Sequence, residues 1–76
     1  MGGADALDRA LLAAHAAGDG AALARLYAQA ADQAEARGQE ARAGFYLTHA
    51  YVFALEQGDA AAGVLHARLK ALGREE

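Results

Sequence analysis

The side chains that could carry chemistry in this sequence are few and widely spaced. None of its three histidines, His15, His49 and His66, has a second histidine three or four residues away. A zinc site needs three or four converging ligands, and on a helix two of them are often four residues apart. Asp19 does follow His15 by four residues, but this aspartate is better placed to cap a helix. We therefore expect ordinary, partly exposed histidines, with no metal ion and no other cofactor.

Nucleophilic and phosphate-binding groups are equally scarce. The chain has no cysteine and no serine, and its single threonine, Thr48, falls within an expected helix. A threonine hydroxyl there commonly bonds back to a preceding carbonyl oxygen. The segment GDGAA at 18–22 lacks both the Lys-Ser/Thr ending and the preceding strand of a phosphate-binding loop. We expect no catalytic residues and no enzymatic activity.

One polar row is regular. Arg42, His49 and Glu56 recur every seven residues, which places them on one stripe of a helix. Such a stripe can form the wall of a groove or a simple solvated face. The sequence favours the solvated face, because such a face needs no special role.

Length and charge restrict the class of protein. Seventy-six residues allow a single domain, 1–76. The net charge of −3 and the scattered basic residues argue against nucleic acid as a partner. No apolar run reaches the roughly 18–20 residues of a membrane span, and the first residues carry acids where a signal peptide needs bases. We expect a cytoplasmic protein without membrane insertion, and the bias toward alanine and arginine resembles bacterial proteins from GC-rich genomes.

The elements that position these residues are expected to be helices. The chain has 24 alanines and no proline, so the strongest helix former dominates and nothing breaks a helix from within. Apolar spacing predicts four helices, at about 5–17, 20–37, 39–57 and 60–72. The third is apolar around most of its circumference and should sit centrally.

Two similar segments mark the expected joints between helices. AAGDGAAL at 16–23 and QGDAAAGV at 57–64 each place a glycine before an aspartate. Gly18 and Gly58 can adopt the left-handed conformation that ends a helix, and Asp19 and Asp59 can cap the next one. By the same rules Asp5 should cap the first helix, Gly38 and Gly73 should end the second and fourth, and 74–76 should form a solvated tail. A shift of forty residues also superposes Leu7 on Leu47 and Ala14 on Ala54, which suggests an internal repeat.

The segment LEQGDAAAGVLHARLKAL at 55–72 resembles the turn and second helix of a tetratricopeptide repeat. Gly58-Asp59, Gly63 and Lys70-Ala71-Leu72 match its turn, its small residue and its helix end. The spacing is forty rather than thirty-four residues, and the closing proline is absent. The resemblance implies an all-α fold of four antiparallel helices in two stacked hairpins, and a role in holding a protein partner. The same helices could also close into an up-down four-helix bundle.

The helix lengths suggest where a partner would bind. The second and third helices are expected to be longer than the outer two, so the tip of their hairpin at 37–39 should protrude. Residues beside it would then be partly uncovered and could bind another protein or a second copy of the chain. The candidate interface comprises Ala34, Ala41, Phe45, Tyr46 and Phe53. In a competing interpretation, Phe45 and Tyr46 fill the core against Leu26 and Ala30.

Two functions are compatible with these features. The first is a small protein-interaction module or adaptor subunit. Because repeat arrays usually need three or more units, a chain with about two is expected to form a homo-oligomer or to join a larger complex. The second is a sensor of a small molecule or effector, with a pocket lined by Tyr27, Tyr46, Tyr51 and His49.

Overall fold

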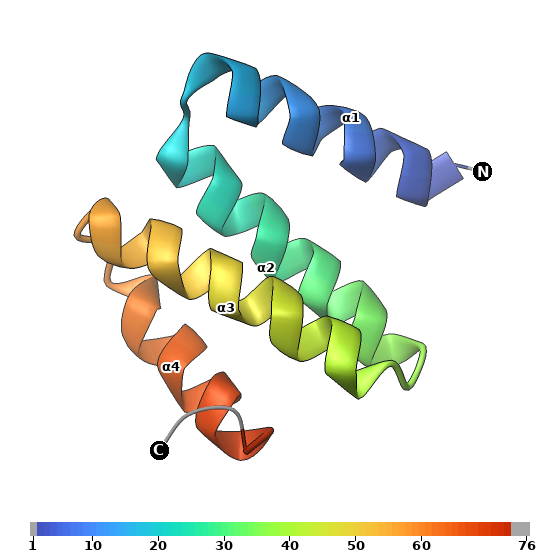
Figure 1. Ribbon diagram of the computed structural model, residues 1–76, viewed down its shortest axis with the longest axis vertical. Helices are drawn as coiled ribbons and strands as arrows, with labels where there is room; N and C mark the ends of the chain where they lie inside the picture. Colours follow the sequence, from blue (N-terminus) through green and yellow to red (C-terminus); the bar gives the residue numbers. More distant parts are fainter. Residues whose placement is uncertain (1, 74–76) are drawn as a thin grey trace.

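The protein folds into four helices, shown in Figure 1 as a computed structural model that describes residues 2–73. Helix α1 spans Gly2–Ala17, α2 spans Gly20–Ala36, α3 spans Glu40–Glu56 and α4 spans Ala61–Ala71. No strand occurs among these residues. The predicted all-α fold is therefore confirmed, and every helix end except the first agrees with the prediction to within one residue. The tail expected at 74–76 lies outside the described residues.

Helices that are neighbours in sequence are also neighbours in space. The most extensive packing joins α2 to α3, while α1 packs on α2 and α4 packs on α3. Consecutive helices reverse direction, and α1 and α4 lie on opposite sides of the central α2–α3 pair (Figure 1). The described part of the chain measures 32 × 30 × 14 Å and is thus flat. The helices form this open arrangement rather than the closed bundle that was the alternative.

The three joints between helices share one backbone geometry. Gly18, Gly38 and Gly58 have φ angles of 65°, 72° and 65°, in the left-handed region predicted for them. At each joint the N–H of the following residue donates to the carbonyl oxygen five residues back, at 2.9 Å. This bond satisfies a carbonyl that the end of the helix leaves unpaired. The same joint thus recurs every twenty residues and sets the helix lengths.

Both aspartates accept a hydrogen bond from the helix that follows, but only Asp19 is an N-cap as predicted, because the N-cap of α4 is Ala60. The Oδ1 atom of Asp19 accepts a hydrogen bond from the N–H of Ala22 at 3.1 Å. The Oδ1 atom of Asp59 accepts one from the N–H of Ala61 at 2.9 Å. Each bond satisfies one of the free amides in the first turn of a helix. At the middle joint, the side chain of Gln39, the N-cap of α3, makes no such hydrogen bond.

The first helix begins earlier than predicted. Helix α1 begins at Gly2, so Asp5 lies within it and is not its N-cap. Helix α1 diverges from α2 toward the hairpin tip (Figure 1), and Leu7 and Asp8 line a cavity that lies between α1 and Arg37. Ala34, which the prediction left partly uncovered, is only 2% exposed.

The core is built mainly from alanine and leucine. Leu47 of α3 and Leu69 of α4 are the largest fully buried side chains among the described residues. The positions that are 0% exposed are otherwise alanines of α2 and α3, namely Ala31, Ala43, Ala50 and Ala54. Methyl groups of this size let two helices approach closely and interlock at the density of a protein interior. The aromatic rings consequently lie around this core rather than inside it.

Alanine substitutions at two glycines with similarly open surroundings, Gly58 and Gly63, test the role of the joints. An added Cβ would meet no atom within 4 Å at either Gly58 or Gly63. Gly63 lies inside α4, so Gly63→Ala should raise the free energy of unfolding by about 0.5–1 kcal/mol. Gly58 has a φ of 65°, so Gly58→Ala should lower it by about 1–2 kcal/mol. Urea unfolding of the two variants and the parent chain measures both effects. An unchanged stability of Gly58→Ala would contradict the assignment of the joint.

Candidate interaction surface

A cluster of rings joins the first three helices. The ring of Tyr27 on α2 stacks on Phe53 of α3, with centroids 6.0 Å apart and planes inclined by 4°. Its hydroxyl lies 2.9 Å from the Nε2 atom of His15 on α1. Tyr46 and His49 of α3 complete the surroundings of the ring, at centroid distances of 6.2 and 5.0 Å. The half-buried Tyr27 thus ties α1 to the central pair, a role of His15 and Tyr27 that the sequence did not reveal.

The outward side of α3 carries a row of apolar and charged side chains, all exposed except the half-buried His49. It is defined by alternating spacings of three and four residues and comprises Arg42, Phe45, His49, Val52 and Glu56. We call it the α3 stripe. Phe45 is 58% exposed and Val52 is 44% exposed, whereas the alanines of α3 on the opposite side are buried. The predicted polar row of Arg42, His49 and Glu56 is therefore interleaved with two large apolar side chains.

The ring of Phe45 is held in place by its neighbours. It lies 4.4 Å from the ring of His49 and 5.6 Å from that of Tyr46, measured between centroids. The Nδ1 atom of His49 donates a hydrogen bond to the carbonyl oxygen of Phe45 at 2.9 Å, since a carbonyl can only accept. The Thr48 hydroxyl donates to the carbonyl oxygen of Gly44, also at 2.9 Å, as predicted. These local contacts fix the side chains at the centre of the stripe.

A shallow hollow adjoins the centre of the stripe. It has a volume of about 220 Å³ and is lined by Thr48, His49, Val52 and Phe53. Because its walls are mostly the apolar parts of these side chains, it suits an apolar group. Leu55, three residues beyond Val52 and 54% exposed, widens the apolar surface toward the end of α3.

The predicted interface residues have different positions in the structure. Phe45 and Ala41 are exposed on α3, and Tyr46 and Phe53 are half-buried at the edge of the stripe. Ala34 is buried and does not reach the surface. Phe45 therefore does not fill the core, which was the competing interpretation. Val52 was not among the predicted interface residues. It follows Phe45 by seven residues, a spacing that places both on the same face of a helix.

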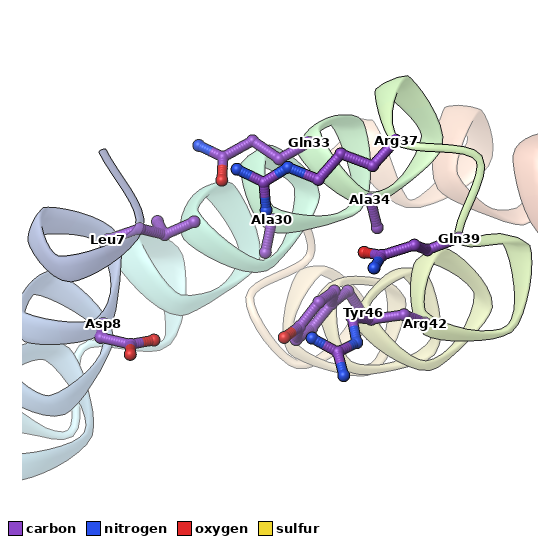
Figure 2. Close-up of a pocket in the computed structure, with 9 residues that line it drawn as sticks. All are labelled: Leu7, Asp8, Ala30, Gln33, Ala34, Arg37, Gln39, Arg42 and Tyr46. Atoms are coloured by element: carbon purple, nitrogen blue, oxygen red, sulfur yellow. The ribbon is translucent and has the colours of Figure 1, made fainter. Parts of the chain in front are cut away.

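A polar cavity lies between α1 and the hairpin tip. Figure 2 shows the Asp8 carboxylate and the Tyr46 hydroxyl facing the same space, with Gln33 and Arg37 along its rim. Its volume of about 220 Å³ is below the roughly 300–1,000 Å³ of typical small-molecule sites. Tyr51 is not part of it. Of the four residues predicted to line a pocket, Tyr27, Tyr46 and His49 lie together, whereas Tyr51 stacks instead on His66 of α4 at 5.3 Å.

A third depression follows the boundary of α2 and α4. Its volume is about 560 Å³. At one end Arg68 of α4 bridges to α2, with ion pairs of 2.7 Å to Asp32 and 3.0 Å to Glu35. Its apolar lining consists of Val64, Leu65 and four small side chains, namely Ala21, Ala24, Ala28 and Ala61. No aromatic ring lines this groove, so it lacks the side chain that most often anchors a protein partner.

His15 and His49 lie on either side of the Tyr27 ring cluster, whereas His66 lies apart from them on α4. His15 contacts Tyr27, His49 contacts Phe45, and His66 stacks on Tyr51. Among the side chains that the structure describes, no three histidine, aspartate or glutamate residues converge as metal ligands would. The histidines of the described chain thus act in ring contacts and hydrogen bonds.

Comparison with known proteins assigns no family to the chain. No family model matches it, and no curated protein or solved structure does so either. Within the described residues, no helix has the combined length and apolarity that crossing a membrane requires. The α3 stripe is therefore the feature on which a functional proposal rests.

Two ring deletions should separate the ring that holds the fold from the ring on the surface. Tyr27→Ala removes the ring that links three helices and should lower the free energy of unfolding by about 2 kcal/mol or more. Phe45→Ala removes a mostly exposed ring and should cost less than about 1 kcal/mol. Both are measured by urea unfolding at low protein concentration. Equal losses in the two variants would contradict this division.

Proposed function

We propose that this chain is a small non-catalytic protein-interaction module or adaptor subunit that binds its partner through the α3 stripe. The observation that carries the proposal is the exposure of Phe45 and Val52, 58% and 44%, on one face of the central helix. Contiguous exposed apolar surface on a small protein is typical of a binding site.

The composition of the surface supports binding to a protein. Aromatic side chains contribute most to the energy of protein interfaces, and Phe45 stands at the centre of this one with Tyr46 and Phe53 at its edge. The charges of Arg42 and Glu56 lie at its two ends, where an interface is usually polar. The contacts of Phe45 with His49 and Tyr46 also restrain its ring before binding, which lowers the entropy lost on association.

Other exposed apolar side chains do not form a comparable surface. Leu12 on α1 is 70% exposed and Val64 on α4 is 65% exposed, each on a different helix from the stripe. A single exposed residue such as Leu12 is common on soluble proteins and needs no partner. Val64 borders the groove between α2 and α4, which no aromatic ring lines. The resemblance of 55–72 to a tetratricopeptide repeat also supports a protein partner, since such repeats hold proteins.

Site-directed photo-crosslinking in the native host tests this proposal. A benzophenone amino acid at position 45 should give covalent protein adducts, identified by mass spectrometry. The same group at position 12, where Leu12 is more exposed than Phe45, is the matched control and should give none. Val52→Asp should reduce the adducts formed at position 45, because it places a charge in the apolar interface. No adduct at position 45, or equal yields at both positions, would contradict the proposal.

A further inference from the structure

We infer that the partner of the α3 stripe is a second copy of this chain, packed so that the two α3 helices run antiparallel and cross near His49. This inference rests on the proposed function, because it names the partner of the same surface. Two features of the stripe and its edge, a pair of opposite charges and a ring with a hollow, are arranged about one centre, and a twofold axis through that centre pairs each with its complement.

The first feature is the placement of opposite charges. Arg42 lies seven residues before His49 and Glu56 lies seven residues after it, roughly 10 Å to either side along the helix. A twofold axis at His49, perpendicular to α3, places Arg42 opposite Glu56 of the partner subunit. The reciprocal contact follows by symmetry, so the interface contains two ion pairs. Neither Arg42 nor Glu56 forms an ion pair with another described residue, unlike Arg68, although Arg42 also lines the cavity that the Asp8 carboxylate faces (Figure 2).

The positions of these two charges relative to the helix dipole also favour an antiparallel neighbour. Arg42 is the third residue of α3 and Glu56 is its last, whereas the dipole of a helix favours acids at its start and bases at its end. These two charges are therefore unfavourably placed within their own helix. An antiparallel neighbour reverses this, because Arg42 then lies near the negative end of the partner's helix and Glu56 near its positive end.

The second feature is the ring of Phe45, which lies on one side of His49 while the hollow lies on the other. Phe45 precedes His49 by four residues, and the hollow lined by Thr48, His49, Val52 and Phe53 lies at and just beyond His49. The same twofold axis brings Phe45 of each copy toward the hollow of the other. Two exposed rings would be covered in this way without any change in the backbone. An unrelated protein would not require charge, ring and hollow to share one centre.

Charge reversal at the two ends of the stripe tests the arrangement. The purified chain should behave as a dimer that dissociates upon dilution over about a hundredfold range, followed by light scattering. Arg42→Glu and Glu56→Arg should each raise the dissociation constant at least about tenfold, because each replaces two attractive pairs by two repulsive ones. Both reversals suit the helix dipole, so circular dichroism should show a folded chain in each case.

Mixing the two variants provides the sharpest measurement. A mixed dimer of Arg42→Glu with Glu56→Arg has opposite charges at both ends, so an equimolar mixture should recover dimerisation to within about threefold of the parent chain. Arg9→Glu, an exposed change on α1 that alters the net charge as Arg42→Glu does, is the control and should leave dimerisation unchanged.

Other outcomes would overturn the antiparallel dimer, and they distinguish its failure from that of the proposed function. A chain that stays monomeric over the whole range, or single reversals that dimerise like the parent chain, would overturn the antiparallel dimer. If the purified chain is monomeric while position 45 crosslinks to a different protein, this inference fails and the proposed function stands. If position 45 yields no adduct at all, the proposed function fails and the inference fails with it.

Discussion

The close approach of α2 and α3 through alanine side chains is the constraint on which the rest of the structure depends. Ala31 on α2 and Ala50 and Ala54 on α3 are fully buried between neighbouring helices. Methyl groups leave no room for a ring at this contact, so the rings of α3 are displaced around its circumference. Phe53 lies on the flank that meets Tyr27, Tyr51 lies on the flank that meets α4, and Phe45 points outward. The aromatic surface is thus a consequence of an alanine core.

The helix ends could be predicted from the sequence because the signals that set them act locally. A glycine in the left-handed region and an aspartate that accepts from the next turn need no distant contact, so the joints at Gly18 and Gly58 follow from a few residues. The start of α1 was wrong for a related reason. An aspartate suits the first turn of a helix as well as its N-cap, and Gly2 begins a helix whose first turn contains Asp5.

The exposed face of α3 could be predicted only in part, because α3 is apolar around most of its circumference. Periodicity then cannot tell which apolar side meets the neighbouring helices. Phe45 was expected at the surface because the hairpin tip would protrude, but it is exposed because the packed side of α3 consists of alanines and Leu47. Ala34 was misplaced because α2 packs most extensively on α3, so that even this residue beside the joint is buried. Long-range packing, rather than local preference, decided both positions.

The same helix serves the core and the proposed interface, and this links folding to association. Only Leu47 and Leu69 are large, fully buried side chains in the described chain, and small domains bury a limited fraction of their surface. Apolar area left on Phe45 and Val52 contributes nothing to the monomer, yet covering it is worth about 25 cal/mol per Å². A partner that binds only the folded form shifts the folding equilibrium by mass action. Because α2 and α4 both pack on α3, such a partner would stabilise these helices as well as the one it contacts.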